Sequence, residues 1–312
     1  MKNIKIHFLN TIWSDAILLE NNNHYGFVDT GSLFYYPMVD KHLKDSNIKN
    51  IEFIILTHFH SDHYGNIVNI VNDYNVKKLY LKHYYGLDGT TSSGFESNEE
   101  YIKNEFIKYD NVIEACRANN TEIVFVDEYD DNDIYTIKFN DVDIELYDIK
   151  NTLYELYSDI NGLYYNQKRF NENFNSMGVF IKIGNNNIFL GGDVTCSKTD
   201  VVELQDLSIK MINNIYKKHN INQIDVYKSC HHGGGGTNTK ELCNLMKSKY
   251  CVITNTARWL DTYSTFDNLK NGNKDVVILP SDHQKYIFSI DENNIKYEEI
   301  KEESLFITLG KN

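Results

Sequence analysis

A short segment of the chain, Thr57-His58-Phe59-His60-Ser61-Asp62-His63-Tyr64-Gly65, brings together three histidines and an aspartate. It directly follows residues 53–56, an apolar run with the length and β-branched content of a buried strand. Residues two apart at a strand end project to the same side, so His58 and His60 are expected to face one point. Asp62 and His63 follow in the turn into a helix. Imidazole nitrogen and carboxylate oxygen suit zinc or a similar first-row divalent ion, and the segment therefore predicts a metal site.

Two later strand ends carry the same types of ligand. The apolar residues 188–190 run into Gly191-Gly192-Asp193, where glycine lets the backbone approach a crowded centre. A carboxylate at that position can bridge two cations through its two oxygens. A further predicted strand, which starts at Asp225, leads into Cys230-His231-His232-Gly233. Because each motif stands at the end of a predicted strand, together they predict a site for two metal ions.

These motifs belong to a longer series of matching segments, spread over roughly residues 4 to 300. The series consists of Ser14-Asp15-Ala16-Ile17-Leu18, Val28-Asp29-Thr30-Gly31, His58 to Gly65, Asn175-Ser176-Met177-Gly178, Gly191-Gly192-Asp193 and Asp225 to Gly233. In this order they resemble the metallo-β-lactamase-fold hydrolases. Within that superfamily the chain is most similar to phosphorylcholine esterase catalytic domains and to the hydrolase domain of DNA-uptake channel proteins. Tyr80-Leu81-Lys82 and Thr237-Asn238-Thr239 favour the esterase-like branch.

The resemblance implies an α/β fold, a metallo-β-lactamase-like αββα sandwich in which two mixed β-sheets are flanked by helices and the metals lie at one rim. It also implies how the ligands are shared. We assign His58 and His60 to one ion, Asp62, His63 and His232 to the other, and Asp193 to the bridge between them. His231 is expected to contact phosphate or to protonate the leaving group, although its role could be exchanged with that of His232, and Asp62 also counts as catalytic.

Two residues near these motifs have alternative interpretations. Asp29 is expected to orient a ligand histidine from behind, or else only to form a hairpin turn. Many members of the superfamily carry another metal histidine shortly before the bridging aspartate, but here the segment reads Asn173-Phe174-Asn175-Ser176. The ion held by His58 and His60 should then have fewer protein ligands and leave room for water or substrate. Asn175 could supply a carbonyl ligand, donate to substrate or cap a turn.

Length, charge and cysteine content narrow the class of protein. The chain has 312 residues, of which 41% are hydrophobic, and it shows no linker or repeat, so residues 1–312 are expected to form a single domain. A net charge of -13 with dispersed basic residues disfavours nucleic acid and favours a small phosphoester. No apolar segment is long enough for a signal peptide or a membrane span. The five scattered cysteines predict reduced thiols and a cytoplasmic protein; for Cys230, a buried thiol is favoured over a metal ligand.

The predicted elements are strands in runs with helices between them, a pattern that fits a sandwich covered by helices. Helices are expected directly after His63 and over 98–118, 200–218 and 238–247. Strands are expected over 4–9, 15–20, 25–29, 52–56, 78–82, 122–126, 134–139, 142–148, 177–183, 187–192, 225–229, 250–254, 275–279, 286–291 and 295–300.

Two segments fall outside this pattern and could select the substrate. Residues 83–101 read as a loop over the metal rim. Residues 150–172 form an insert rich in tyrosine, with Tyr154, Tyr157, Tyr164 and Tyr165. The tyrosines could be ordinary packing residues, or an aromatic wall that holds a ligand by stacking or by cation–π attraction; Tyr164 and Tyr165 are the candidate substrate contacts.

The function predicted from the sequence is hydrolysis by two divalent metal ions, with zinc expected and manganese as the alternative. A hydroxide shared by the metals would attack phosphorus in a small phosphodiester, because metal binding lowers the pKa of water from about 16 to near 7. A metal-dependent nuclease, or a lactone or thioester hydrolase of the same fold, is the enzymatic alternative. A module that binds a phosphorylated ligand without turnover is the non-enzymatic one.

Overall fold

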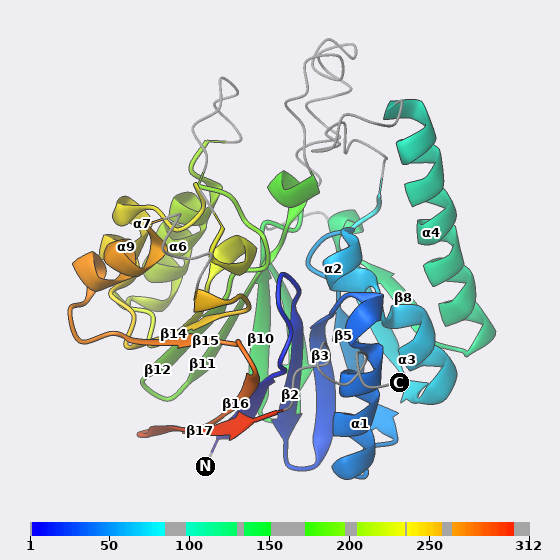
Figure 1. The fold of residues 1–312 in the computed structure, drawn as a ribbon, viewed down its shortest axis with the longest axis horizontal. Helices are drawn as coiled ribbons and strands as arrows, with labels where there is room; N and C mark the ends of the chain where they lie inside the picture. Colours follow the sequence, from blue (N-terminus) through cyan, green and yellow to red (C-terminus); the bar gives the residue numbers. More distant parts are fainter. Residues whose placement is uncertain are drawn as a thin grey trace.

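Two β-sheets lie face to face at the centre of the computed structural model (Figure 1). The structure describes residues 2–84, 98–129, 134–150, 172–196, 205–234, 236–257 and 264–302. The first sheet has the strand order β17-β16-β1-β2-β3-β5-β7-β8 and the second has the order β15-β14-β13-β12-β11-β10-β9. A two-stranded pair, β4 and β6, accompanies them. In each sheet, antiparallel strands at one end give way to parallel strands at the other.

The strands of the first sheet come from both ends of the chain. β16 pairs antiparallel with β1, with Asn3 opposite Asp291 and Phe8 opposite Tyr286. The bounds are β1 Asn3–Phe8, β2 Ala16–Asn21, β3 His24–Thr30, β5 Phe53–Ile55, β7 Lys78–Leu81, β8 Glu122–Phe125, β16 Gln284–Asp291 and β17 Ile295–Lys301, with β4 Asn50–Ile51 and β6 Asn75–Val76 in the small pair.

The second sheet is built from one continuous part of the chain. Its parallel strands β12 to β15 place their carboxyl ends at one edge. The bounds are β9 Ile134–Phe139, β10 Val142–Tyr147, β11 Gly178–Ile183, β12 Asn186–Leu190, β13 Val226–Lys228, β14 Tyr250–Ile253 and β15 Val277–Pro280.

Helices cover the outer face of each sheet (Figure 1). Over the first sheet lie α1 Tyr36–Asp45, α3 Ile67–Asp73 and α4 Asn98–Ala118; over the second lie α6 Leu207–His219, α7 Lys240–Met246 and α9 Thr265–Gly272. Side chains from both sheets form the inner core between them. One outer core lies between the first sheet and its helices, and another lies between the second sheet and its helices. Burial on both faces explains why the central strands are apolar almost without interruption. The expected αββα sandwich of two mixed sheets is confirmed.

The structure also differs from the predicted elements at several places. Helices α1 and α9 were not expected from the sequence. The helix expected after His63 starts earlier and is divided into α2 Ser61–Tyr64 and α3, so that Asp62 and His63 lie in a helical turn. The helix expected over 200–218 starts at Leu207, because Gln205 and Asp206 before it form a turn; residues 197–204 lie outside the described residues. Residues 85–97 of the expected rim loop and residues 151–171 of the tyrosine-rich insert also lie outside them.

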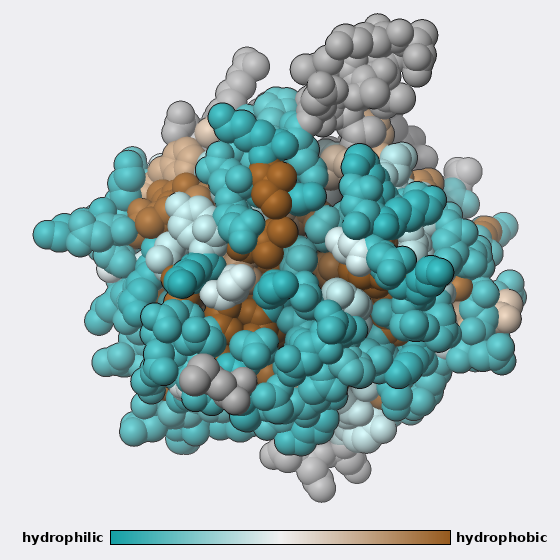
Figure 2. Space-filling view, turned by 90° about the horizontal axis from the view of Figure 1, so that it is seen from below, coloured by the Kyte–Doolittle hydropathy of each residue, from teal (hydrophilic) through white to brown (hydrophobic). Residues whose placement is uncertain are grey.

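The end of the molecule turned away from α2 is mainly hydrophilic. Figure 2 shows this end, with apolar residues visible only in narrow strips between polar ones. In the part of the chain that the structure describes, no helix has the length and apolar character needed to cross a membrane.

Candidate metal centre

The residues of the His58 to His63 segment are held by the strand end that precedes them. Thr57 donates its backbone N–H to Asp29 Oδ1 at 2.8 Å and its hydroxyl to Asp29 Oδ2 at 2.8 Å. Two residues after the segment, Gly65 packs so closely that a Cβ there would lie 2.5 Å from the carbonyl of Ser61 and 2.6 Å from the backbone nitrogen of Leu33. The turn is thereby fixed on both sides, and α2 directs Asp62 and His63 toward the second sheet.

Asp193 lies at the centre of two groups of ligand-type atoms, one on each of its carboxylate oxygens. On the Oδ2 side, His58 Nε2 lies 3.8 Å from Oδ2 and 3.0 Å from His60 Nδ1. His231 Nε2 lies on the same side, also 3.8 Å from Oδ2. This first group therefore brings together His58, His60 and His231, all of which the sequence analysis selected.

The second group surrounds the other oxygen of the same carboxylate. His63 Nε2 lies 3.3 Å and His232 Nε2 lies 3.6 Å from Asp193 Oδ1. Asp62 Oδ2 completes the group, at 3.0 Å from His232 Nε2 and 3.6 Å from His63 Nε2. All four of these residues were expected to hold the second ion or to bridge it to the first.

These two groups fit divalent metal ions. His63 Nε2 and Asp193 Oδ1 are buried, and neither has a hydrogen-bond partner among the described residues. Such orphaned polar atoms are costly unless something satisfies them. Ligand atoms of His58, His60 and Asp193, and likewise those of His63, Asp193, His232 and Asp15, lie within 4.8 Å of one another. Neutral imidazole and carboxylate donors of this kind suit zinc and similar ions.

The two groups differ in how strongly their histidines hold protons. Burial alone would lower the pKa of His232, but Asp193 and Asp15 outweigh it and raise the pKa to about 9. The pKa of His63 is also raised well above its usual value, because Asp193 and Asp29 outweigh its burial. Burial holds the pKa of His58 well below its usual value. Without metal, His63 and His232 of the second group therefore carry protons at neutral pH, whereas His58 of the first group does not.

A buried carboxylate stands behind each histidine of the second group. Asp29 Oδ2 lies 2.7 Å from His63 Nδ1, and Asp15 Oδ1 lies 3.1 Å from His232 Nδ1. Asp15 also accepts a hydrogen bond from the Thr254 hydroxyl at 2.6 Å. Since the Nε2 atoms face Asp193 and Asp62, we place Asp15 behind His232 and not among the metal ligands. A carboxylate in that position fixes the tautomer and the ring orientation of a ligand histidine.

A fully buried lysine adjoins the centre. The ammonium of Lys228, at the end of β13, forms an ion pair with Asp15 Oδ2 and donates to the carbonyl of Gly192 at 3.1 Å. Burial alone would lower the pKa of Lys228, but Asp15 and Asp193 outweigh it and raise the pKa. Burial would raise the pKa of Asp15, but Lys228 and then His232 outweigh it and hold the pKa below its usual range. For Asp29, burial outweighs the neighbouring His63 and raises the pKa.

The structure corrects the local geometry expected for the double histidine. His231 and His232 were expected at a strand end, where adjacent side chains point to opposite sides. Instead β13 ends at Lys228 and both histidines lie in the 3-10 turn Cys230–Gly233, with φ of 48° and 50°. The two rings still face different groups, and their centroids are 6.0 Å apart. Cys230 is buried, and burial raises the pKa of its thiol to about 12.

The structure describes Asn175 but not the other two predicted substrate contacts, Tyr164 and Tyr165. Asn175 accepts from Lys82 Nζ at 3.2 Å and donates to Glu172 Oε1 at 3.2 Å. Both amide atoms thus have protein partners, and the ligand or substrate role stays a prediction. Tyr164 and Tyr165 lie outside the described residues.

Three contributors to the centre were not recognised in the sequence. Asp15 and Lys228 stood in quoted motifs without a role, whereas Thr254 carried no signal at all. Ser14-Asp15-Ala16, next to a strand, was the available clue.

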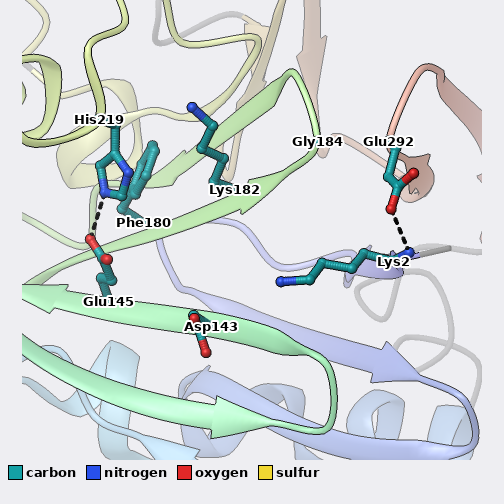
Figure 3. A pocket seen from close by; sticks show the side chains of 8 residues that line it. All are labelled: Lys2, Asp143, Glu145, Phe180, Lys182, Gly184, His219 and Glu292. Atoms are coloured by element: carbon teal, nitrogen blue, oxygen red, sulfur yellow. Dashed lines mark hydrogen bonds and ion pairs between the residues drawn. The ribbon is translucent and has the colours of Figure 1, made fainter.

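A surface cavity of about 380 Å³ lies elsewhere, beside β10 and β11 (Figure 3). Its lining includes Glu145, which accepts from His219 Nε2 at 2.8 Å, together with Lys182 and Glu292. None of the ligand-type residues around Asp193 lines it. The cavity is therefore not the centre at which chemistry is expected.

Comparison with known proteins identifies the fold. Residues 14–152 match the sequence model of the Metallo-beta-lactamase superfamily, a range that runs from just before β2 to just after β10 and includes His58 to His63. The chain has the metallo-β-lactamase fold. The expected resemblance to this superfamily is thus confirmed, and its members are mostly metal-dependent hydrolases. A comparison with curated proteins gave no match.

Several solved structures are similar to the chain at low sequence identity. A new diphosphatase from the PhnP family is 11% identical over 96% of this chain and 98% of its own, with a TM-score of 0.44. The metallo-beta-lactamase fold protein YhfI from Bacillus subtilis is 11% identical over 95% of this chain and 100% of its own, also with a TM-score of 0.44. Rm3 metallo-beta-lactamase is 8% identical over 72% of this chain and 77% of its own, with a TM-score of 0.41. Likenesses this distant carry no information on substrate.

Proposed function

We propose that the protein is a hydrolase with two divalent metal ions, and that it cleaves a small phosphodiester. The observation that carries the proposal is the position of Asp193 between two groups of ligand atoms, with one carboxylate oxygen facing each. A pair of cations bridged in this way suits displacement at phosphorus, where both the attacking and the leaving oxygen need stabilisation. We propose zinc for both positions, with manganese as the alternative.

We assign the metal ligands of the chain to the two ions as follows. His58, His60 and Asp193 would hold one ion, and Asp62, His63, His232 and Asp193 the other. Bound there, two divalent ions would lower the pKa of a water molecule to near 7 and neutralise charge on the phosphoryl oxygens.

His231 is the residue we propose to contact substrate. Its side chain is 37% exposed, whereas that of His232 is 1% exposed. Burial lowers the pKa of His231, so its ring is neutral at pH 7 and able to donate one hydrogen bond from a ring N–H. We propose that this N–H contacts a phosphoryl oxygen or the leaving group.

The charge of the chain supports a small substrate. A net charge of -13 works against a long polyanion, which a basic groove would normally hold. The five free and buried thiols support a reducing compartment, and we propose the cytoplasm.

Metal analysis combined with a substrate panel tests the proposal. We expect two zinc or manganese ions per chain, and turnover of bis-(p-nitrophenyl) phosphate well above that of a lactone, a thioester or an oligonucleotide. Faster cleavage of the lactone or thioester would favour the carbonyl hydrolase. Salt-sensitive cleavage of oligonucleotides would favour the nuclease, and retention of a phosphorylated ligand without turnover would favour the binding module.

A pair of adjacent substitutions tests the roles of the two histidines. His232→Ala should lower metal content, because His232 faces Asp62 and Asp193 from a buried position. His231→Ala should keep at least the ion of the second group and lower turnover. Loss of that ion in His231→Ala, with two ions retained in His232→Ala, would reverse the assignment.

A further inference from the structure

Lys228 is an unexpected residue to find beside a cluster of metal ligands. Its side chain is wholly buried at the end of β13, and its ammonium contacts Asp15 and the carbonyl of Gly192. A buried charge persists only when it is paired and hydrogen-bonded. The contacts of Lys228 connect it to two proposed metal ligands by separate routes: to His232 through Asp15, and to Asp193 through the backbone of Gly192.

The first route passes through Asp15 to His232. Lys228 holds Oδ2 of Asp15, while Oδ1 accepts from the Thr254 hydroxyl at 2.6 Å and lies 3.1 Å from His232 Nδ1. The carboxylate cannot rotate without breaking one of these contacts. The ring of His232 is held at Nδ1 by this carboxylate and by the Thr254 hydroxyl, whose oxygen lies 2.9 Å away and which itself donates to Asp15. The direction of Nε2 therefore depends on Lys228 through Asp15.

The second route passes through the backbone to Asp193. The carbonyl of Gly192 accepts from Lys228 Nζ at 3.1 Å and from the backbone N–H of His231 at 2.9 Å. Gly192 has a φ of +47°, and a Cβ there would lie 2.6 Å from Ser176 Oγ. The turn that carries Asp193 is therefore fixed by Lys228 on one side and by close packing on the other.

The comparison with Asp29 shows what the cation adds. Asp29 orients His63 while bonding to the neutral backbone and hydroxyl of Thr57. Asp15 stands in the same relation to His232, but it has an ammonium as a further partner. Two buried carboxylates, Asp15 and Asp193, converge on His232. Removing Lys228 would take away the cation in contact with Asp15 Oδ2 and leave the negative charge of this buried carboxylate only partly compensated.

We propose that Lys228 is a positioning residue of the metal centre, which fixes His232 through Asp15 and Asp193 through Gly192. It touches neither the metals nor the substrate. The proposal rests on the proposed metal centre, and it is independent of which ester is cleaved. The proposal predicts that replacing Lys228 weakens zinc binding at the second group, to which His232 belongs.

The experiment compares Lys228→Met, the double variant Asp15→Asn/Lys228→Met and a control, Lys249→Met. Lys249 is a surface lysine whose side chain is 52% exposed, and it pairs with the buried Asp225. Each metal-free protein is checked by circular dichroism and thermal melting. Zinc is then titrated against a chromophoric chelator, to obtain separate affinities for the first and the second ion, and kcat and KM are measured on bis-(p-nitrophenyl) phosphate.

We expect Lys228→Met to bind the second zinc about 10- to 100-fold more weakly, the size of effect known for residues that orient metal ligands. The first zinc and the KM should change less than threefold, while kcat falls at subsaturating zinc. The double variant should melt at a higher temperature than Lys228→Met, because no buried charge is left unpaired, yet it should keep the weak second site. Lys249→Met should behave as the unmodified protein.

The double variant decides between positioning and mere charge compensation. If it binds two zinc ions with the affinities of the unmodified protein, Lys228 only neutralises Asp15 and the proposal is overturned. Failure of the double variant to fold would also overturn it, since the pair would then be a requirement of folding. If the unmodified protein binds two zinc ions but hydrolyses no phosphoester, the proposed substrate class fails while the zinc affinities still decide the role of Lys228.

Discussion

Replacing Asp193 with asparagine tests the bridge directly. The amide side chain would keep the shape of the carboxylate, but it offers one oxygen where the aspartate offers two, one toward His58 and His231 and one toward His63 and His232. Whichever way the amide turns, one group faces an NH₂. Two unit charges about 4 Å apart interact by about 4 kcal/mol at an effective dielectric constant near 20, which corresponds to roughly 10³-fold in a dissociation constant. We therefore expect Asp193→Asn to hold one ion tightly and to lose the other.

The assay is metal content after exhaustive dialysis, followed by calorimetric titration with zinc. Asp225→Asn is the matched control, because Asp225 is also buried but bonds to the backbone of Asn187 at 2.8 Å and to Lys249 at 2.8 Å, next to the start of β13. The control should keep two ions and full turnover. Two ions bound to Asp193→Asn with unchanged affinity would refute the bridging role, and most of the turnover retained with one ion would refute the dinuclear mechanism.

Three further predictions concern the second group and the turn that carries it. At pH 7 the metal-free protein should be protonated on His232, whose pKa is raised to about 9, and on His63. Zinc must displace these protons to bind. The zinc affinity of the second group should therefore rise with pH up to about 9, by about tenfold per pH unit for each proton displaced. Calorimetry in buffers of different ionisation enthalpy counts the protons, and a pH-independent affinity between pH 6 and 9 would contradict this. Asp29→Asn, which leaves the Nδ1 side of His63 without its carboxylate, should weaken zinc binding about 10- to 100-fold in chelator competition while the fold is kept; unchanged binding would mean that Asp29 serves only the backbone of Thr57. Gly65→Ala places a Cβ 2.5 to 2.8 Å from three backbone atoms, and it should lower both the melting temperature and the metal content, whereas unchanged values would show that the turn can shift freely.

The gathering of these ligand-type residues around Asp193 could be predicted from the sequence because their signal is local. His58, His60, Asp62 and His63 stand in one short segment, and strand ends gather such residues at one rim. The αββα sandwich followed from the resemblance and from the runs of apolar strands. Helix α1 was missed because its N-cap position is Tyr35, so its start at Tyr36-Pro37 lacked the usual polar capping signal.

The supporting contacts could not be predicted, because they join distant parts of the chain. Asp15 and His232 are 217 positions apart, and Thr254 reaches Asp15 across 239. No local spacing reports such a contact. A buried lysine such as Lys228 looks, in the sequence, like one more polar residue at a strand end. Its pairing with Asp15 depends on how the two sheets meet at the rim, which periodicity does not encode.

The pairing of β1 with β16 sets an order on how the chain can fold as it is made. β1 can form a hairpin with β2 at once, but its other neighbour is not synthesised until Gln284–Asp291. Until then the outer edge of β1 is a row of unpaired backbone groups, the kind of edge that recruits strands from other chains. The candidate metal ligands are likewise spread from His58 to His232, and Thr254 follows them. An ion held by these residues would therefore bind only after His232 has been synthesised, so metal binding would stabilise a late stage of folding and would not direct its start.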